Sequence, residues 1–178
     1  MEATGAMEDG DDPESPGCLV WLYHFLAQHF DYLGNFDDAL RYVDLGLAHT
    51  PTLIELYVAK GRIFKHAGHI DYAVACLDEA QSLGKFFYKK LISKYNCCFF
   101  TSYVPLFKDT ADRYLNCKCC AYLIRAGEIE RAEKMAAQFT RENTTVQENL
   151  KEMQVLWFQI ECAETYFRQG TDNFYDYI

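Results

Sequence analysis

Apolar residues recur along this chain at intervals of three and four residues, the spacing that groups them on one face of an α-helix. In residues 18–51 this pattern forms two successive segments, the first ending at Gly34 and the second at Pro51. Glycine and proline commonly close a helix. The apolar and small positions of this first predicted pair are Leu26, Ala27, Phe30, Ala39, Val43 and Gly46. The pattern therefore predicts two helices that pack together through these faces.

The same pattern returns one period later. Gly34 aligns with Gly68 and Ala39 with Ala73, and each pair is 34 positions apart. The other equivalents in the second unit are Gly61, Phe64, Leu77 and Ala80. A period of 34 residues with one helix pair per unit is that of tetratricopeptide repeats. We therefore predict an all-α, tetratricopeptide-like helix-pair solenoid, whose first two repeats occupy residues 18–83.

A third unit is predicted at residues 109–141, with Gly127 and Ala132 in the same roles, but its spacing is too long. Gly127 follows Gly68 by 59 residues, which exceeds the period by 25. The stretch 84–108 has that length, and removing it restores the period. It contains five lysines, no acidic residue and no sustained helical period, so we predict an atypical insert.

Two interpretations of the insert stay open. One is a translated intron, because Gly84 and Lys85 can be encoded by a splice-donor sequence, and several residues between Cys97 and Phe107 can use pyrimidine-rich codons. The other is an ordinary insertion loop between two repeats.

Residues 142–178 are predicted to form a connector and an incomplete fourth repeat. Residues 148–169 have the pattern of one helix, and Gly170 would end it, but residues 171–178 supply no partner helix. A solenoid buries its apolar faces only against neighbouring helices. We therefore expect this last helix to expose an apolar stripe, formed by Leu156, Phe158, Cys162 and Tyr166.

Composition and charge exclude several classes of protein. The 178 residues are 50% hydrophobic, enough for a core, and carry a formal charge of −9, which argues against specific DNA binding. Residues 1–17 contain six acidic residues and no apolar run, so we expect a disordered acidic segment rather than a secretory signal. No stretch is long enough to span a membrane. We expect a cytoplasmic protein with reduced thiols, and leave the nucleus open as a second location.

No catalytic motif is found, because the chain lacks a phosphate-binding glycine loop, an acetyl-coenzyme A loop and a nucleophile elbow. Cys117 and Cys120 have the spacing of half a zinc site, but no second half accompanies them. Cys119 and Cys120 also fall at small-residue positions of a predicted helix, where cysteine packs as a small hydrophobe. We therefore predict no metal site and no catalytic residue.

Basic residues on the first helices of the units are the main candidates for binding. They are Lys60, Arg62, Lys65, His66, Arg113, Lys118 and Arg125. Stacking of the units could bring Lys60 or Lys65 close to Arg113 or Lys118, which would suit a phosphorylated small molecule or an RNA backbone. The alternative is an ordinary solvated face.

Three strings exceed a generic repeat pattern: PTLIELYVAKGRIFKHAGHIDYA, LDTADRYLNCK once the insert is removed, and NLKEMQVLWFQIECA. They resemble the auxiliary subunit of the NatA N-terminal acetyltransferase complex, of which this chain would be an internal fragment or a divergent paralogue. The resemblance implies a non-catalytic scaffold that binds the catalytic subunit and supports co-translational N-terminal acetylation at the ribosome.

The resemblance also implies an inositol polyphosphate, such as inositol hexakisphosphate, held as a structural ligand between the two subunits. The nominated binding residues are Lys60, Lys65, His66, Arg113 and Lys118. Two other functions stay open. One is a generic tetratricopeptide adaptor that binds an unrelated peptide or protein. The other is a metal- or thiol-dependent enzyme built on Cys117 and Cys120.

Overall fold

The computed structural model describes residues 16–95, 110–140 and 144–170, and in these ranges it is built of helices without strands. The helices are α1 (Pro16–Tyr32), α2 (Phe36–His49), α3 (Ile54–His66), α4 (Ile70–Tyr95), α6 (Thr110–Arg125), α7 (Ile129–Ala136), the 3-10 turn η1 (Ala137–Phe139), α8 (Val146–Glu152) and α9 (Leu156–Gln169). The predicted all-α class is confirmed. The predicted acidic segment 1–17 lies almost wholly outside the described residues, as does 171–178.

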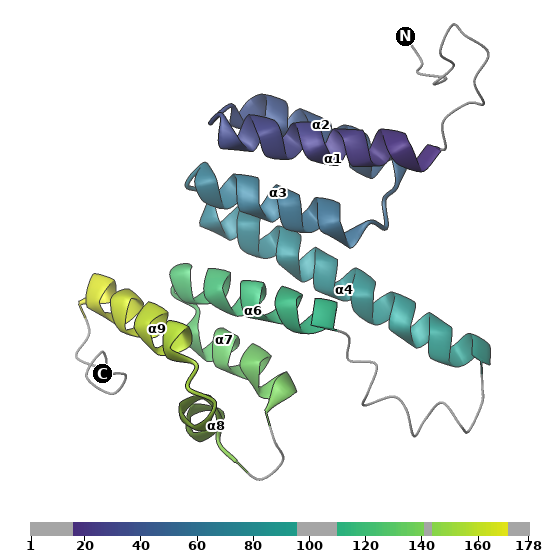
Figure 1. Ribbon diagram of the computed structural model, residues 1–178. Helices are drawn as coiled ribbons and strands as arrows, with labels where there is room; N and C mark the ends of the chain where they lie inside the picture. The colour runs from purple at the N-terminus through teal and green to yellow at the C-terminus, as the bar shows by residue number, and fades with distance from the viewer. Residues whose placement is uncertain (1–15, 96–109, 141–143, 171–178) are drawn as a thin grey trace, which may run out of the picture.

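The helices stack as successive pairs (Figure 1). Helices α1 and α2 pack on each other, as do α3 with α4 and α6 with α7. Both α1 and α2 contact α3, and α4 contacts α6, so that each pair packs on the next. Helix α9 continues the stack by packing on α6. We call α1, α3, α6 and α9 the A helices, because each occupies the first position of its unit. The arrangement is the predicted helix-pair solenoid.

The first three A helices end in the same turn. In each, the glycine after the helix has a positive φ, and the following N–H donates to a carbonyl oxygen five residues earlier. The glycines are Gly34 (77°), Gly68 (85°) and Gly127 (88°). The N–H groups of Asn35, His69 and Glu128 donate to the carbonyls of Phe30, Phe64 and Leu123 at 3.0, 2.8 and 2.9 Å. This is the Schellman ending that favours glycine, so the sequence period corresponds to a repeated backbone structure.

Small residues lie where helix backbones come close, as predicted. A Cβ added at Gly61 would lie 3.2 Å from the backbone oxygen of Ala73, between α3 and α4. A Cβ at Gly46 would lie 2.9 Å from a methyl group of Leu56, between α2 and α3. Both positions therefore set the distance between neighbouring helices.

The apolar core forms two clusters. The first joins α1, α2 and α3 and includes Ala27, Val43 and Ile63. The second joins α4, α6, α7 and α9 with Tyr57 of α3, and it includes Leu77 and Leu123. Among the residues that the structure describes, α3 is the one helix with buried members in both clusters.

The prediction for the last helix was wrong in two of its four residues. Phe158 and Cys162 are fully buried in the second cluster, and Tyr166 packs against it, while Leu156 is exposed. The reason is that an A helix packs backward on the preceding unit, so that face is already covered by α6. The opposite face of α9 is the open one, and the exposed large apolar residues of this helix are Leu156, Trp157, Ile160 and Phe167.

Three helix boundaries also differ from the prediction. Residues 148–169 form two helices rather than one, because the chain turns at Gln154, which has a φ of 54°. Helix α8 begins earlier than predicted, at a capping box in which Thr145 and Glu148 each form a side-chain hydrogen bond with the other's backbone N–H.

Helix α4 continues past residue 84 to Tyr95, whereas we predicted no regular helix there. Residues 85–95 contain no glycine or proline, so nothing in the backbone stops the helix.

Candidate polyanion-binding site

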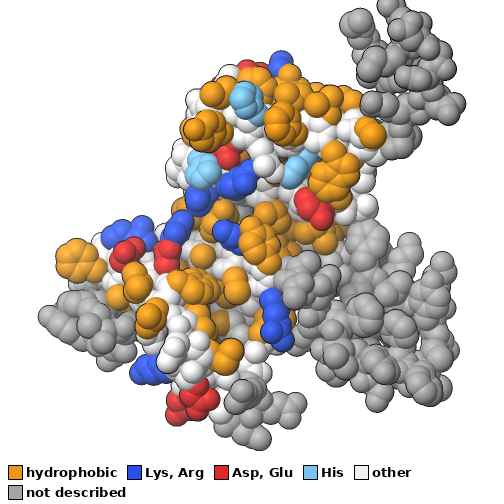
Figure 2. All heavy atoms as spheres, viewed as in Figure 1, with side chains coloured by type: hydrophobic (Ala, Val, Ile, Leu, Met, Phe, Trp, Pro, Cys, Tyr) orange, Lys and Arg blue, Asp and Glu red, His pale blue; other side chains and the backbone are white. Residues whose placement is uncertain are grey.

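Cationic side chains gather on the face formed by the A helices. Figure 2 shows Lys and Arg in a band between the α1 and α9 layers of this face. They border two hollows that share no lining residue. The upper hollow, about 350 Å³, is lined by His24, Gln28, Ile54, Glu55, Val58, Ala59, Arg62, Leu77, Tyr114, Leu115, Lys118 and Tyr122. The lower hollow, about 680 Å³, is lined by Lys65, Gly68, Ile70, Arg125, Glu161, Glu164, Phe167 and Arg168.

The lower hollow combines three cations with two carboxylates. Arg125 Nε donates to Glu161 Oε2 at 2.9 Å, and its Nη2 donates to the other carboxylate oxygen, so the pair is bidentate. These hydrogen bonds from Arg125 lower the pKa of Glu161, with smaller contributions from Arg168 and Lys65. They also raise the pKa of Arg125. Both groups therefore stay charged across the physiological range.

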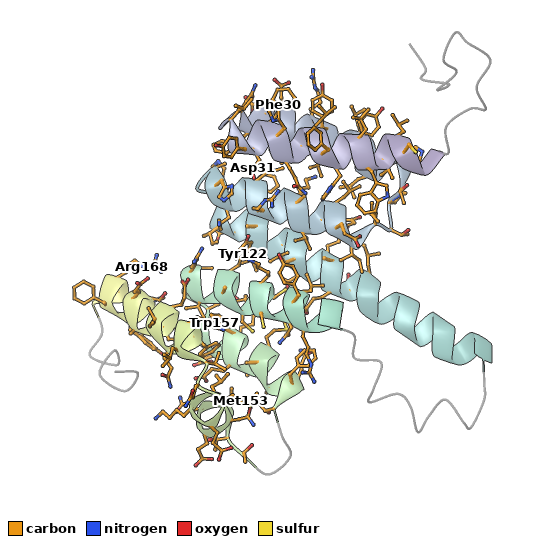
Figure 3. All side chains as sticks on the ribbon, in the orientation of Figure 1. Phe30, Asp31, Tyr122, Met153, Trp157 and Arg168 are labelled. Carbon is orange, nitrogen blue, oxygen red and sulfur yellow. The ribbon has the colours of Figure 1, made fainter. Side chains whose placement is uncertain are left out.

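Lys65 lines the lower hollow together with Arg125 and Arg168. Burial lowers its pKa, and the neighbouring charges of Arg125 and Lys118 lower it further. Its ammonium lies 6.0 Å from the centre of the Tyr122 ring, within the range of a cation–π contact. Figure 3 shows Tyr122 and Arg168 on the same side of the stack, from α6 and α9. An anion bound here would relieve the repulsion among these cations.

The upper hollow has an apolar floor and a cationic edge. Lys118 lies 5.5 Å from the centre of the Tyr114 ring, and Arg62 approaches from α3. Burial and the charge of Arg62 lower the pKa of His24, which bonds Gln28 one turn away. The neutral imidazole is therefore favoured at this edge.

A buried carboxylate joins α1 to α3. Asp31 Oδ2 lies 3.2 Å from Nε of Arg62, and its Oδ1 lies 2.8 Å from Nδ1 of His66. Figure 3 shows Asp31 at the end of α1, above α3. Asp31 thus provides the counter-charge for Arg62 and a hydrogen-bond partner for His66.

Of the five nominated residues, Lys65 lines the lower hollow and Lys118 lines the upper one, and the charge of Lys118 contributes to the lowered pKa of Lys65. His66 lines neither hollow and binds Asp31 instead. Lys60 forms an ion pair of 2.7 Å with Asp44 of α2, and Arg113 lies 5.8 Å from the centre of the Phe139 ring. Binding of a polyanion by the five nominated residues stays a prediction.

Three arginines that line the two hollows were not among the residues nominated from the sequence to bind a polyanion. Arg62 and Arg125 were recognised as basic residues of the A helices but were not nominated, and Arg168 was not singled out. Arg125 lies seven residues after Lys118 and Arg62 lies three before Lys65, spacings that share a helix face, so the signal was present. Arg168 could not be found this way, because its position depends on how α9 packs.

Two of the three cysteines of α6 are core residues. Cys119 and Cys120 are buried, and the Cys120 thiol lies 3.6 Å from the carbonyl oxygen of Ala132. Burial raises the pKa of Cys120 to about 12. Cys117 is exposed.

In the described ranges, no group of three or more His, Cys, Asp or Glu could hold a metal ion. None of the helices in the same ranges has the length and apolarity of a membrane span.

Stacked helix pairs with a cationic face define this chain as a helical-repeat protein of the kind that binds other molecules along its surface. A family model described as N-terminal acetyltransferase A, auxiliary subunit, matches residues 1–86 and 107–173. The chain belongs to this family. Residues 87–106 lie between the two matched segments, inside the predicted insert.

Individual relatives agree with this assignment. The chain is 43% identical over 162 residues to the human N-alpha-acetyltransferase 16, NatA auxiliary subunit, covering 91% of this chain and 16% of the relative. It is 38% identical to the N-terminal acetyltransferase A complex auxiliary subunit NAA15 of Arabidopsis thaliana, covering 94% of this chain and 16% of the relative. The chain thus spans about a sixth of these relatives.

A solved structure has the same fold. A chain in the structure of Naa15/Naa10 bound to HypK-THB superposes with a TM-score of 0.67 at 30% identity, covering 85% of this chain and 20% of the other. The solenoid is therefore shared across most of the sequence described here.

Proposed function

We propose that this chain is a non-catalytic scaffold segment of the NatA complex that binds the catalytic acetyltransferase subunit. The observation that carries the proposal is its 43% identity to a NatA auxiliary subunit across 91% of the chain, over the helices that form the cationic face. The solved structure with the same fold is a complex of Naa15 with Naa10, which supports a catalytic subunit as the partner. Acetyl transfer takes place on that partner, in the cytoplasm and at the ribosome, on proteins still being synthesised.

The lower hollow is the proposed site of an inositol polyphosphate, with inositol hexakisphosphate as the ligand. Lys65, Arg125 and Arg168 supply cations from three different helices, and Lys118 lies close enough to Lys65 to lower its pKa. Guanidinium groups bind phosphate oxygens in pairs, and several phosphates on one ring could use these cations together. The ligand would serve as a structural bridge between the scaffold and its partner.

Co-expression with the NatA catalytic subunit tests the scaffold role. We expect a tagged form of this chain to retain the catalytic subunit on affinity resin and to increase its acetylation of peptide N-termini. A matched version lacking residues 84–108 shows whether the insert weakens assembly. The proposal is wrong if neither version retains the catalytic subunit while both are folded by circular dichroism.

A generic peptide adaptor remains the second candidate, and the upper hollow favours it. That hollow offers apolar residues such as Val58 and Leu115 beside Arg62 and Lys118, a combination that suits an acidic peptide. An adaptor would bind short peptides without the catalytic subunit. Capture of a peptide pool by the chain alone, with no retention of the catalytic subunit, would favour it.

A further inference from the structure

Glu161 is already paired with Arg125, the guanidinium that a phosphate in the lower hollow would use. Its carboxylate forms two hydrogen bonds with the Arg125 guanidinium, the same bidentate arrangement in which arginine binds a phosphate. The Glu161 side chain is 19% exposed and that of Arg125 is 39% exposed, so the pair lies at the wall of the lower hollow rather than in open solvent. A ligand that uses this guanidinium has to displace or share it.

The packing of α9 on α6 holds the Glu161 carboxylate beside Arg125. Glu161 is flanked on α9 by Phe158 and Cys162, which are buried against α6, the helix that carries Arg125. A carboxylate attached to a packed helix stays at a high effective concentration beside its partner. The hydrogen bonds from Arg125 keep the carboxylate ionised, since they lower its pKa. It therefore competes with incoming anions throughout the physiological range.

We propose that Glu161 is a selectivity residue of the lower hollow, which excludes anions with a single phosphate and admits only those with several. The inference rests on the proposed polyanion site. A single phosphate that displaces Glu161 gains about as many charge-assisted hydrogen bonds as the protein loses. An anion with several phosphates gains more, because it also reaches Lys65 and Arg168, which border the same hollow.

The competing explanation is that Glu161 only positions Arg125. The two explanations predict opposite changes in anion affinity when Glu161 is removed. If Glu161 only holds Arg125 in a geometry that suits the ligand, its removal weakens binding of every anion. If Glu161 competes with the ligand, its removal strengthens binding, and most of all for the smallest anion. The direction of the change therefore separates the two roles.

Glu164 supplies the matched control. It lies one turn further along α9, lines the same hollow and contributes to the charge around Arg125, but it is exposed. Glu164→Gln changes the net charge by the same amount as Glu161→Gln. A general electrostatic effect would appear in both variants, whereas competition for the guanidinium would appear only in Glu161→Gln.

Isothermal titration of the full chain and its variants, with inositol hexakisphosphate and with inorganic phosphate, tests the proposal. We expect Glu161→Gln to bind inorganic phosphate about tenfold more tightly, the equivalent of one charge-assisted hydrogen bond, and the hexakisphosphate by a smaller factor. We expect changes below about threefold in Glu164→Gln. Glu161→Asp, which keeps the charge but shortens the reach, should give an intermediate result, and it serves if Glu161→Gln melts too early.

Each contrary result has its own meaning. Weaker binding in Glu161→Gln, or equal changes in Glu161→Gln and Glu164→Gln, overturns the selectivity role and leaves the site standing. Failure of the hexakisphosphate to bind the wild-type chain and every variant overturns the proposed polyanion site, and the selectivity role with it.

Discussion

Gly61 of α3 faces the backbone oxygen of Ala73 in α4, so closely that a Cβ at residue 61 would lie 3.2 Å from that oxygen. The same Cβ would lie 3.4 Å from the side chain of Leu77. The spacing of the second helix pair therefore depends on the missing side chain. This contact is the physical basis of the small-residue pattern in the sequence.

Gly61→Val should destabilise the protein by about 1–3 kcal/mol, because the branched side chain forces α3 away from α4. The matched control is Ala75→Val, at an exposed position of α4, which should cost about half a kcal/mol through helix propensity alone. Urea denaturation followed by circular dichroism measures both. Equal losses in the two variants would contradict the close-packing argument.

Phe158→Ala should cost about 3–5 kcal/mol, since the ring is 1% exposed in the second core cluster. Phe167→Ala, on the open face of the same helix where the ring is 72% exposed, should change the free energy of unfolding by less than about 1 kcal/mol. Thermal melts of the two variants distinguish the buried face of α9 from the exposed one. A larger loss of stability in Phe167→Ala than in Phe158→Ala would mean that Phe158 lies on the exposed face, as predicted from the sequence.

Thr145→Ala should destabilise α8 by about 1 kcal/mol, because it removes the acceptor for the Glu148 backbone N–H. Thr145→Ser keeps that acceptor and should behave like the wild type. Hydrogen exchange of the α8 amides is the suitable measurement, since a short helix contributes little to the global melt. Unchanged exchange in the alanine variant would mean that α8 is held by packing alone.

The Arg125–Glu161 pair should stabilise the protein at neutral pH and lose this effect in acid. The pKa of Glu161 lies below its ordinary value of 4.5, so its contribution is complete above that value and is lost as the pH falls through the lowered pKa. Glu161→Gln should therefore be less stable than wild type at pH 7, by less than about 1 kcal/mol for a partly exposed pair. The difference should vanish in acid, as urea melts at pH 7, 5 and 3 would show. A difference that grows in acid would contradict the assignment.

The thiols of the Cys117–Cys120 motif should differ sharply in reactivity. Cys117 is exposed, whereas Cys120 is buried and its pKa is raised to about 12. Maleimide labelling at pH 7 should modify Cys117 quickly and Cys120 only after unfolding. Mass spectrometry of Cys117→Ser and Cys120→Ser variants checks this, and rapid labelling at Cys120 would reopen the metal or thiol interpretation.

The repeat could be predicted because it depends on local rules. Gly34, Gly68 and Gly127 are required by a left-handed backbone turn, and Gly61 by a close approach, so each leaves a mark in the sequence. The capping box at Thr145 is also a local signal, although we assigned that segment to a connector. It sets the start of α8, whereas the break between α8 and α9 lies at Gln154, where φ is positive.

The candidate site was only partly predictable, because it depends on contacts between units. Lys65 and Lys118 lie in different repeats and were nominated from their charge, their helix positions and the family resemblance, none of which could show that Lys60 turns to Asp44. The buried face of α9 and the Arg125–Glu161 pair depend on how the fourth unit packs on the third. That packing has no period in the sequence, so it became visible only in the folded chain.

The division of the core into two clusters that meet in α3 gives the fold a preferred order of opening. The α1–α2 pair can detach by breaking the first cluster, while the helices beyond α3 keep theirs. In such a linear stack, a disturbance at one end reaches the other mainly through the helix buried in both clusters, although Leu47 of α2 also packs against both. Amide exchange should then fall into two cooperative blocks, with α3 as the last element to lose protection. Mechanical communication between the two ends of the segment thus depends mainly on thirteen residues, 54–66.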